Sequence, residues 1–344
     1  QFSYQYQYKY SKSDRGTYDL SNINANFFDV DADYRQWDSY LSLLGNASLD
    51  NYRDNKLSRY SEYKNYIHTA DVMLRVIKKD YNFNVGVQVV PQKSHFVQDY
   101  QSVHTDTTRT VTNVTPTADF RWKISKLSQL RFTYRGNTSQ PSMTDLLDIT
   151  DDSNPLNVKK GNPGLKPSFT QNFRLFYNNY IQNHQRSIMA HLMFSTTDNS
   201  ISNMVTYDKT TGGRTTRPEN INGNWNAFGM FMFNTAIDTA AYFNVNTFTT
   251  VNYSNSVGYV SVDKADSQKS TTRTTNLSER IAASYRNDWL EFELNGSLSY
   301  MHARSKLQAN NNLDTWTFSY GASLMLTAPW GTQLSSGLNM NSRR

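Results

Sequence analysis

The stretch that decides the fold runs from Ser153 to Tyr180 and reads SNPLNVKKGNPGLKPSFTQNFRLFYNNY. Its first half is crowded with Gly, Asn, Pro and Lys, and a proline cannot donate a backbone hydrogen bond to a sheet. Directly after Pro167, large apolar and polar residues begin to alternate. A period of two is typical of a β-strand with one apolar and one polar face. The stretch therefore predicts an irregular loop that ends abruptly in a long amphipathic strand.

The same alternation runs through the rest of the chain. Phe2, Tyr4, Tyr6, Tyr8 and Tyr10 share one face of the opening segment, and Ser3, Gln5, Gln7 and Lys9 share the other. The pattern predicts about fourteen strands, some near twenty residues long, where soluble strands average five or six. The predicted ranges are 2–10, 17–28, 60–78, 81–99, 107–125, 129–138, 168–182, 185–207, 214–236, 241–262, 271–287, 289–305, 313–328 and 331–342.

The connections between these strands are expected to alternate strictly between short and long. Short turns are predicted near residues 78–81, 125–128, 183–185, 238–239, 287–288 and 329–331, and longer segments at 29–59, 101–106, 137–167, 208–214, 263–270 and 304–312. Short periplasmic turns and long extracellular loops are typical of an outer-membrane barrel. The sequence thus predicts an all-β fold, a transmembrane antiparallel β-barrel.

The predicted directions of the two outermost strands indicate a piece of a larger barrel. The first strand is expected to descend from the extracellular side to a turn at residues 11–16, and the last to ascend from Gly331. In a 22-stranded barrel these would be strands eight and twenty-one. Residues 1–344 are therefore expected to form a partial barrel, with the closing strand outside this chain.

Composition excludes several classes of function. The chain has no Cys, so thiol chemistry and thiolate metal sites are excluded. No apolar run approaches the length of a membrane helix. The net charge of +6 comes from Lys and Arg scattered among Asp and Glu, so no nucleic-acid partner is expected. The sequence shows no catalytic motif and no regular metal-ligand spacing. We expect no enzyme activity, no cofactor and no metal, although His95 and His104 could meet near a loop.

The opening stretch also carries a family signature. GNPGLKP, residues 161–167, resembles the GNP-x-LKP signature of TonB-dependent outer-membrane receptors. The wider run from Tyr134 to Tyr180 is similar to the outer-membrane β-barrel family common in Bacteroidota. Residues outside GNPGLKP that match that family's pattern are Arg135, Thr138, Pro141, Ser142, Asp151, Ser153, Asn154, Pro155 and Leu156.

The resemblance implies a 22-stranded barrel in the bacterial cell outer membrane, with an N-terminal plug and a segment that contacts TonB. Neither the plug nor that segment is recognisable in these residues. We expect outer-membrane lipid and lipopolysaccharide as surroundings, TonB as a partner through the plug, and room for a surface lipoprotein partner. The expected function is TonB-dependent transport of a nutrient. A scaffold or adhesin barrel without transport, and a passive porin, remain as alternatives.

The motif is expected to shape an extracellular loop rather than to contact a ligand. Gly161 and Gly164 can supply positive φ angles, while Pro163 and Pro167 hold the chain out of the sheet until Ser168. The residues assigned this structural role are Asn154, Pro155, Leu156, Gly161, Asn162, Pro163, Leu165, Lys166 and Pro167.

The alternation also predicts which charges face the lumen. A charge on the lipid face costs about 2–4 kcal/mol at the midplane, so charged residues should mark the inner face. The lumen-facing candidates are Arg75, Arg121, Lys123, Arg131, Arg135, Arg174, Glu291 and Glu293. The cationic members could attract an anionic substrate or pair with a plug.

Overall fold

The computed structural model describes residues 1–19, 49–100, 103–147, 150–151, 154, 156–182, 185–208, 210–261, 265–308 and 312–344. These residues form two compact units. The first comprises Gln1–Phe2, Asp71–Gln88 and Val114–Arg344, and the second comprises Ser3–Ala70 and Val89–Asn113. The fold is all-β, as the alternation predicted, with one short α-helix and one 3₁₀ turn among the described residues.

Thirteen strands form the main sheet, in the order β1-β2-β3-β4-β5-β8-β9-β12-β13-β14-β15-β16-β17. Their bounds are β1 Phe2–Arg15, β2 Arg59–Ile77, β3 Tyr81–Tyr100, β4 Val103–Lys123, β5 Ser128–Ser139, β8 Ser168–Ile181, β9 Arg186–Asp198, β12 Asn224–Ala236, β13 Phe243–Val260, β14 Gln268–Arg286, β15 Leu290–Ser305, β16 Leu313–Thr327 and β17 Gln333–Arg343. From β4 to β17, neighbouring strands of this sheet pair antiparallel.

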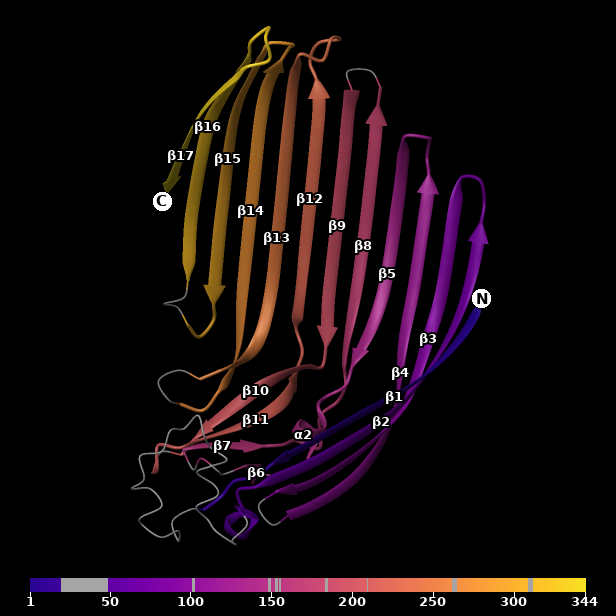
Figure 1. Ribbon diagram of the computed structural model, residues 1–344, viewed down its shortest axis with the longest axis vertical. Helices are drawn as coiled ribbons and strands as arrows, with labels where there is room; N and C mark the ends of the chain where they lie inside the picture. Colours follow the sequence, from indigo (N-terminus) through magenta and orange to yellow (C-terminus); the bar gives the residue numbers. More distant parts are fainter. Residues whose placement is uncertain are drawn as a thin grey trace. The chain divides into compact units, whose positions relative to one another are not determined.

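A second sheet of four strands has the order β10-β11-β7-β6. Its strands are β6 Thr150–Asp151, β7 Asn157–Lys160, β10 Ser200–Tyr207 and β11 Arg214–Ile221. The helix α2, Met143–Leu146, precedes β6 and begins at Ser142, whose side chain accepts a hydrogen bond from the Asp145 amide. In Figure 1 this small sheet lies at the ends of β9 and β12 that are opposite to their short connections to β8 and β13.

The small sheet corrects two predicted strands. The ranges 185–207 and 214–236 each break in two, because the chain leaves the main sheet after Asp198 and re-enters it at Asn224. Asn199 has φ +52° and Gly223 has φ +117°, so both breaks occur at left-handed residues. On either side of this excursion, β9 and β12 pair directly, with Thr197 opposite Asn224.

Two other expectations are wrong. The segment 101–106 is not a long connection, because β3 ends at Tyr100 and β4 begins at Val103. The first strand does not turn at residues 11–16, because β1 continues to Arg15. Most of the predicted strand 17–28 lies outside the described residues.

The direction of the first strand is also opposite to the prediction. The amino group of Gln1 donates to the Met73 carbonyl oxygen at 2.8 Å, near the end of β2. The ring contacts Tyr4–His68 and Tyr8–Tyr66 show that β1 then runs antiparallel to β2. Since β2 ends at the short connection to β3, β1 begins at the short-connection end and does not descend toward it.

The main sheet has one apolar and one polar face. A row of neighbouring aromatic rings crosses the apolar face: Tyr134–Phe173 at 4.8 Å between ring centroids, Phe173–Phe194 at 6.2 Å, Phe194–Trp225 at 5.9 Å and Trp225–Tyr253 at 4.9 Å. Leu192 on this face is 51% exposed. Among the described residues no large side chain is fully buried. Contiguous apolar surface of this extent needs a nonpolar environment, which a bilayer supplies.

None of the described helices is long and apolar enough to cross a membrane.

Candidate functional site

Four arginines gather on the polar face where β4, β5 and β8 pair. Arg121 on β4 lies opposite Arg131 on β5. On β8, Arg174 lies opposite Thr133, between the positions that face Arg131 and Arg135. Opposite side chains in a ladder have Cβ atoms about 5 Å apart, and diagonal neighbours about 7–8 Å. We call Arg121, Arg131, Arg135 and Arg174 the arginine cluster.

One carboxylate offsets this positive charge. Oδ2 of Asp119 accepts hydrogen bonds from Arg131 Nε at 2.8 Å and from Thr133 Oγ1 at 3.0 Å, and it lies 2.7 Å from Arg131 Nη2. Among the described residues, Arg135 and Arg174 have neither a hydrogen-bond nor an ion-pair partner. Four arginines against one aspartate leave a local charge of +3. The cluster is therefore cationic, and Arg121 likewise has no such partner among the described residues, so only Arg131 of the four is paired.

A hollow of about 580 Å³ lies over the cluster, lined by Arg131, Thr133, Arg135, Asn172, Arg174, Phe176 and His191. The rings of Phe176 and His191 meet edge to face, with 6.0 Å between their centroids. Guanidinium groups present a planar fork of donors that matches the oxygens of a carboxylate or phosphate. The geometry can thus hold an anionic group beside an aromatic wall.

The other predicted charges lie elsewhere. Lys123 is at the end of β4, opposite Gln129. Arg75 on β2 donates from Nε to Asn84 Oδ1 at 3.0 Å. On β15, Glu291 pairs with Arg286 at 3.0 Å, and Glu293 accepts from Asn295 at 3.4 Å. In the strand order, β9, β12, β13 and β14 separate β8 from β15, so the two glutamates do not offset the cluster.

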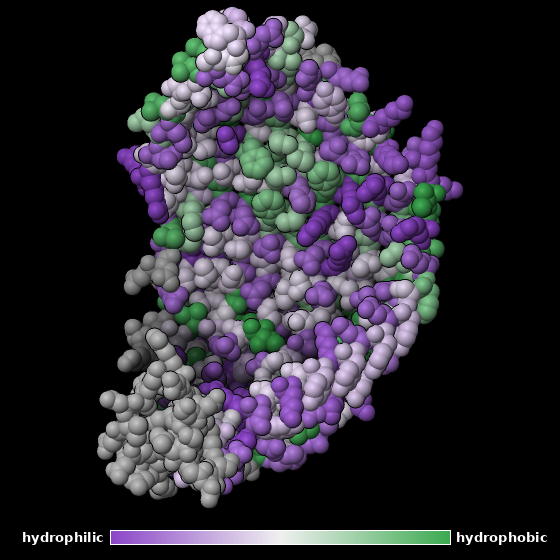
Figure 2. Space-filling view, viewed as in Figure 1, coloured by the Kyte–Doolittle hydropathy of each residue, from purple (hydrophilic) through white to green (hydrophobic). Residues whose placement is uncertain are grey.

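Beyond the hollow the polar face becomes apolar. On β9 and β12, Met189 lies opposite Met232, His191 opposite Met230, and Met193 opposite Phe228; on β13, Phe248 lies opposite Met232. We call Met189, Met193, Phe228, Met230, Met232 and Phe248 the methionine patch. Figure 2 shows a pale-green patch framed by purple polar residues, where Figure 1 has β9, β12 and β13.

The sequence pattern missed this patch. From Ala227 to Phe233 apolar side chains or Gly occupy both faces, so the alternation that separates the faces elsewhere is absent. The usable signal was the density of methionine and phenylalanine on two strands that pair directly.

The GNPGLKP motif makes close contacts within the chain, but its glycines do not have positive φ angles. The described glycines with positive φ are Gly212, Gly223 and Gly331, so the prediction for Gly161 and Gly164 is wrong. Gly161 is instead required by close approach, because a Cβ atom there would lie 1.7 Å from the Leu147 carbonyl oxygen. Pro155 of the wider pattern lies outside the described residues.

Asn162 fastens the motif to β11. Its Nδ2 donates to the Pro218 carbonyl oxygen at 2.9 Å, while its Oδ1 accepts from the Gly164 amide and from Arg217 Nη2, each at 3.0 Å. The Lys166 amide donates to Asn220 Oδ1 at 2.7 Å, and Asn220 Nδ2 donates back to the Lys166 carbonyl oxygen at 3.0 Å. These bonds hold the loop until β8 begins at Ser168, one residue after Pro167.

The remaining motif residues complete this arrangement. Leu165 is only 4% exposed and its amide donates to the Asn162 carbonyl oxygen at 3.2 Å. Asn154 Oδ1 accepts from the Leu156 amide at 3.1 Å, and the Leu156 carbonyl oxygen accepts from the Arg214 amide at 3.1 Å. No signal in the sequence pointed to β11 as the partner of the motif.

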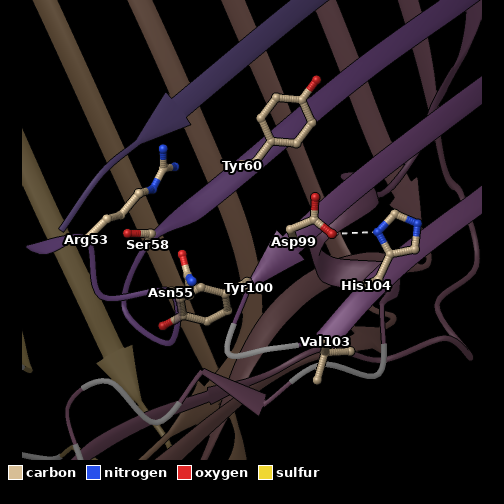
Figure 3. A pocket seen from close by; sticks show the side chains of 8 residues that line it. All are labelled: Arg53, Asn55, Ser58, Tyr60, Asp99, Tyr100, Val103 and His104. Atoms are coloured by element: carbon tan, nitrogen blue, oxygen red, sulfur yellow. Dashed lines mark hydrogen bonds and ion pairs between the residues drawn. The ribbon is translucent and has the colours of Figure 1, made fainter. Parts of the chain in front are cut away.

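A second, smaller hollow of about 380 Å³ lies in the other unit (Figure 3). It is lined by Arg53, Asn55, Ser58, Tyr60, Asp99, Tyr100, Val103 and His104. His104 Nδ1 bonds Asp99 Oδ1 at 2.5 Å, and His95 Nε2 bonds Asp106 Oδ1 at 2.7 Å. The two histidines therefore each pair with an aspartate, and no group of three metal-ligating side chains occurs among the described residues.

Comparison with solved structures finds low similarity. The siderophore receptor PirA from Pseudomonas aeruginosa is 9% identical with a TM-score of 0.40, over 84% of this chain and 58% of that one. The copper transporter OprC is 10% identical with a TM-score of 0.40, over 99% of this chain and 54% of that one. OccK7 (OpdD) from Pseudomonas aeruginosa is 10% identical with a TM-score of 0.28, over 99% of this chain and 94% of that one. The chain thus spans little more than half the length of the first two proteins.

No curated protein matches the sequence. A family model described as the outer membrane protein beta-barrel family matches residues 17–287, more than three quarters of the chain. That match agrees with the two-faced antiparallel sheet and with the apolar face that needs a nonpolar environment. The chain belongs to the outer membrane protein β-barrel family and is a protein of the bacterial outer membrane.

Proposed function

We propose that this chain forms the wall of a TonB-dependent transporter that carries a solute across the outer membrane. The observation that carries the proposal is the division of the sheet into an apolar face and a polar face with a cationic hollow. In a membrane barrel the apolar face meets lipid and the polar face lines the lumen. The GNPGLKP motif supports the TonB-dependent class.

In this function the barrel performs no covalent chemistry. The polar face lines the lumen of a 22-stranded barrel, and a plug fills this lumen. The long connections and the small sheet form the outer surface that meets the solute. TonB, energised from the inner membrane, then acts on the plug to open a path. The part of residues 1–344 is to hold the wall and to present the outer loops.

The test uses the full-length protein. It is purified, mixed with the periplasmic domain of TonB for a pull-down, and separately inserted into planar bilayers for conductance measurements. We expect TonB binding, and bilayers that stay closed without TonB. A steady open conductance without TonB binding would instead assign a passive porin. Neither conductance nor TonB binding would assign a scaffold or adhesin.

A further inference from the structure

We infer that the arginine cluster and the methionine patch form one site for an amphipathic organic anion. The carboxylate or phosphate of the ligand binds Arg135 and Arg174, and its apolar portion lies on the methionine patch. The inference rests on the proposed function, because a solute reaches these residues only if the polar face lines a passage.

The two regions are continuous across the β8–β9 ladder. Arg174 lies opposite Met193, and Phe176 lies opposite His191. The next ladder places Met193 opposite Phe228 and His191 opposite Met230. Charged and apolar side chains therefore occupy directly paired positions, and Phe176 and His191 line the hollow at the boundary.

The charged end has a specific geometry. Asp119 already holds Arg131 and Thr133. Arg135 and Arg174 lie at diagonal positions, and both are exposed. Within the described part of the chain these two side chains lack an acidic partner. Two guanidinium forks at this spacing suit one anionic group between them.

The apolar end is adaptable. Methionine is unbranched and polarizable, so it can follow irregular ligand shapes and contact aromatic rings. His191 already meets Phe228 edge to face, with 6.4 Å between the ring centroids. Each methionine and phenylalanine of the patch is accessible in part, so a ring or short hydrocarbon can cover it. A fully polar anion would leave this surface unused.

The test measures binding of 2-naphthoate to the full-length protein in lipid nanodiscs by isothermal titration calorimetry. Two further probes each carry one part of this ligand: acetate has only the anionic group, and 2-naphthylmethanol has only the rings. We expect 2-naphthoate to bind at least about tenfold more tightly than either. Equal affinity for 2-naphthoate and for either acetate or 2-naphthylmethanol would overturn the inference.

Two double variants test the charged end and the apolar end of the site separately. Arg135→Gln with Arg174→Gln should weaken 2-naphthoate binding about tenfold or more, because both charge-assisted contacts are lost. Met193→Gln with Met230→Gln should weaken it severalfold and leave its salt dependence unchanged. Arg286→Gln and Met301→Gln are matched controls on other strands of the polar face, and neither should alter binding.

Correct assembly is checked by the heat-modifiable gel mobility of each variant. Arg135→Lys with Arg174→Lys keeps the charge and should recover part of the affinity. Unchanged affinity in the assembled Arg135→Gln, Arg174→Gln variant would overturn the site. The TonB pull-down is independent of these results, so TonB binding with no binding of 2-naphthoate would overturn the site alone.

Discussion

The main sheet and the small sheet differ in what sets their register. In the main sheet most strands separate apolar from polar residues, and a slip by one residue would exchange the faces. In the small sheet, β7 and β11 pair in parallel over three residues, and Arg214 Nε of β11 donates to Asn157 Oδ1 of β7 at 2.9 Å. Asn162 and Asn220 add hydrogen bonds between β11 and the GNPGLKP motif. The first register depends on the surroundings of many residues, and the second on a few hydrogen bonds. Four predictions test this difference between the two sheets.

The largest effect is expected from placing a charge on the apolar face. Phe231 and Met232 are neighbours near the middle of β12 and point to opposite faces. Phe231→Arg should lower the free energy of unfolding by about 2–4 kcal/mol, because the charge would enter lipid. Met232→Arg, on the polar face, should cost far less. Equilibrium urea unfolding in lipid vesicles measures both, and equal losses would contradict the assignment of faces.

The motif that follows β7 of the small sheet should be destabilised by substitution of one glycine. Gly161→Ala would bring a Cβ atom against the Leu147 carbonyl oxygen, so the motif must shift at a cost of about 1–3 kcal/mol. Gly164→Ala is the control, because its nearest atom is Asn162 Oδ1 at 3.2 Å. Hydrogen exchange should show lost protection of the Asn162 and Lys166 amides in Gly161→Ala alone. Unchanged protection would show that the close approach is not required.

Substitution of one alanine by glycine in the turn between β12 and β13 should stabilise the protein. Ala241 has φ +59° in the connection between β12 and β13, a conformation that costs alanine but not glycine. Ala241→Gly should raise the free energy of unfolding by up to about 1 kcal/mol, whereas Ala240→Gly should lower it by a similar amount. Thermal unfolding of the two variants measures the difference. Destabilisation by Ala241→Gly would show that the angle carries no strain.

The smallest effect is expected at low pH, where two turns that contain an aspartate, one from each sheet, should open. Backbone hydrogen bonds, from Thr210 to Asp208 and from Phe243 to Asp238, lower the pKa of each carboxyl below its usual value. A lowered pKa gives stabilisation that is present above the unfolded pKa, near 4, and is lost as the pH falls through the folded pKa. Both turns should therefore open in acid.

Amide exchange of Thr210 and Phe243 between pH 5 and pH 2 measures this opening. Asp208→Asn and Asp238→Asn should each remove the acid dependence at its own turn only. Acid opening that persists in an Asn variant would mean that another group titrates there.

The main sheet could be predicted because its signal is repeated in nearly every strand. The pattern identified β8 to within one residue, 168–182 against Ser168–Ile181. Leu130, Phe132 and Tyr134 on one face and Arg131 and Arg135 on the other follow directly from alternation. The direction of β1 was wrong because a polar run at residues 11–15 resembled a turn, although it extends the strand.

The small sheet could not be predicted, because residues 195–200 (STTDNS), where the chain leaves the main sheet, contain neither Gly nor Pro to mark a break in the strand. Only the Asn222-Gly223 pair marked the return as a turn. The arginine cluster followed from the pattern one residue at a time, but its grouping did not. That grouping depends on the register between β5 and β8, across a connection of 28 residues, Gln140 to Pro167.

The direct pairing of β9 with β12 has a consequence for how the outer surface can diversify. The chain leaves and re-enters the main sheet at two adjacent points of an uninterrupted ladder, so a change in length between β10 and β11 need not alter the pairing of β9 with β12. An epitope inserted in the turn between Tyr207 and Arg214 would also leave the contacts of Pro218 and Asn220 with the motif in place. Selection on the exposed surface and selection on the membrane span can then act on separate residues of one chain.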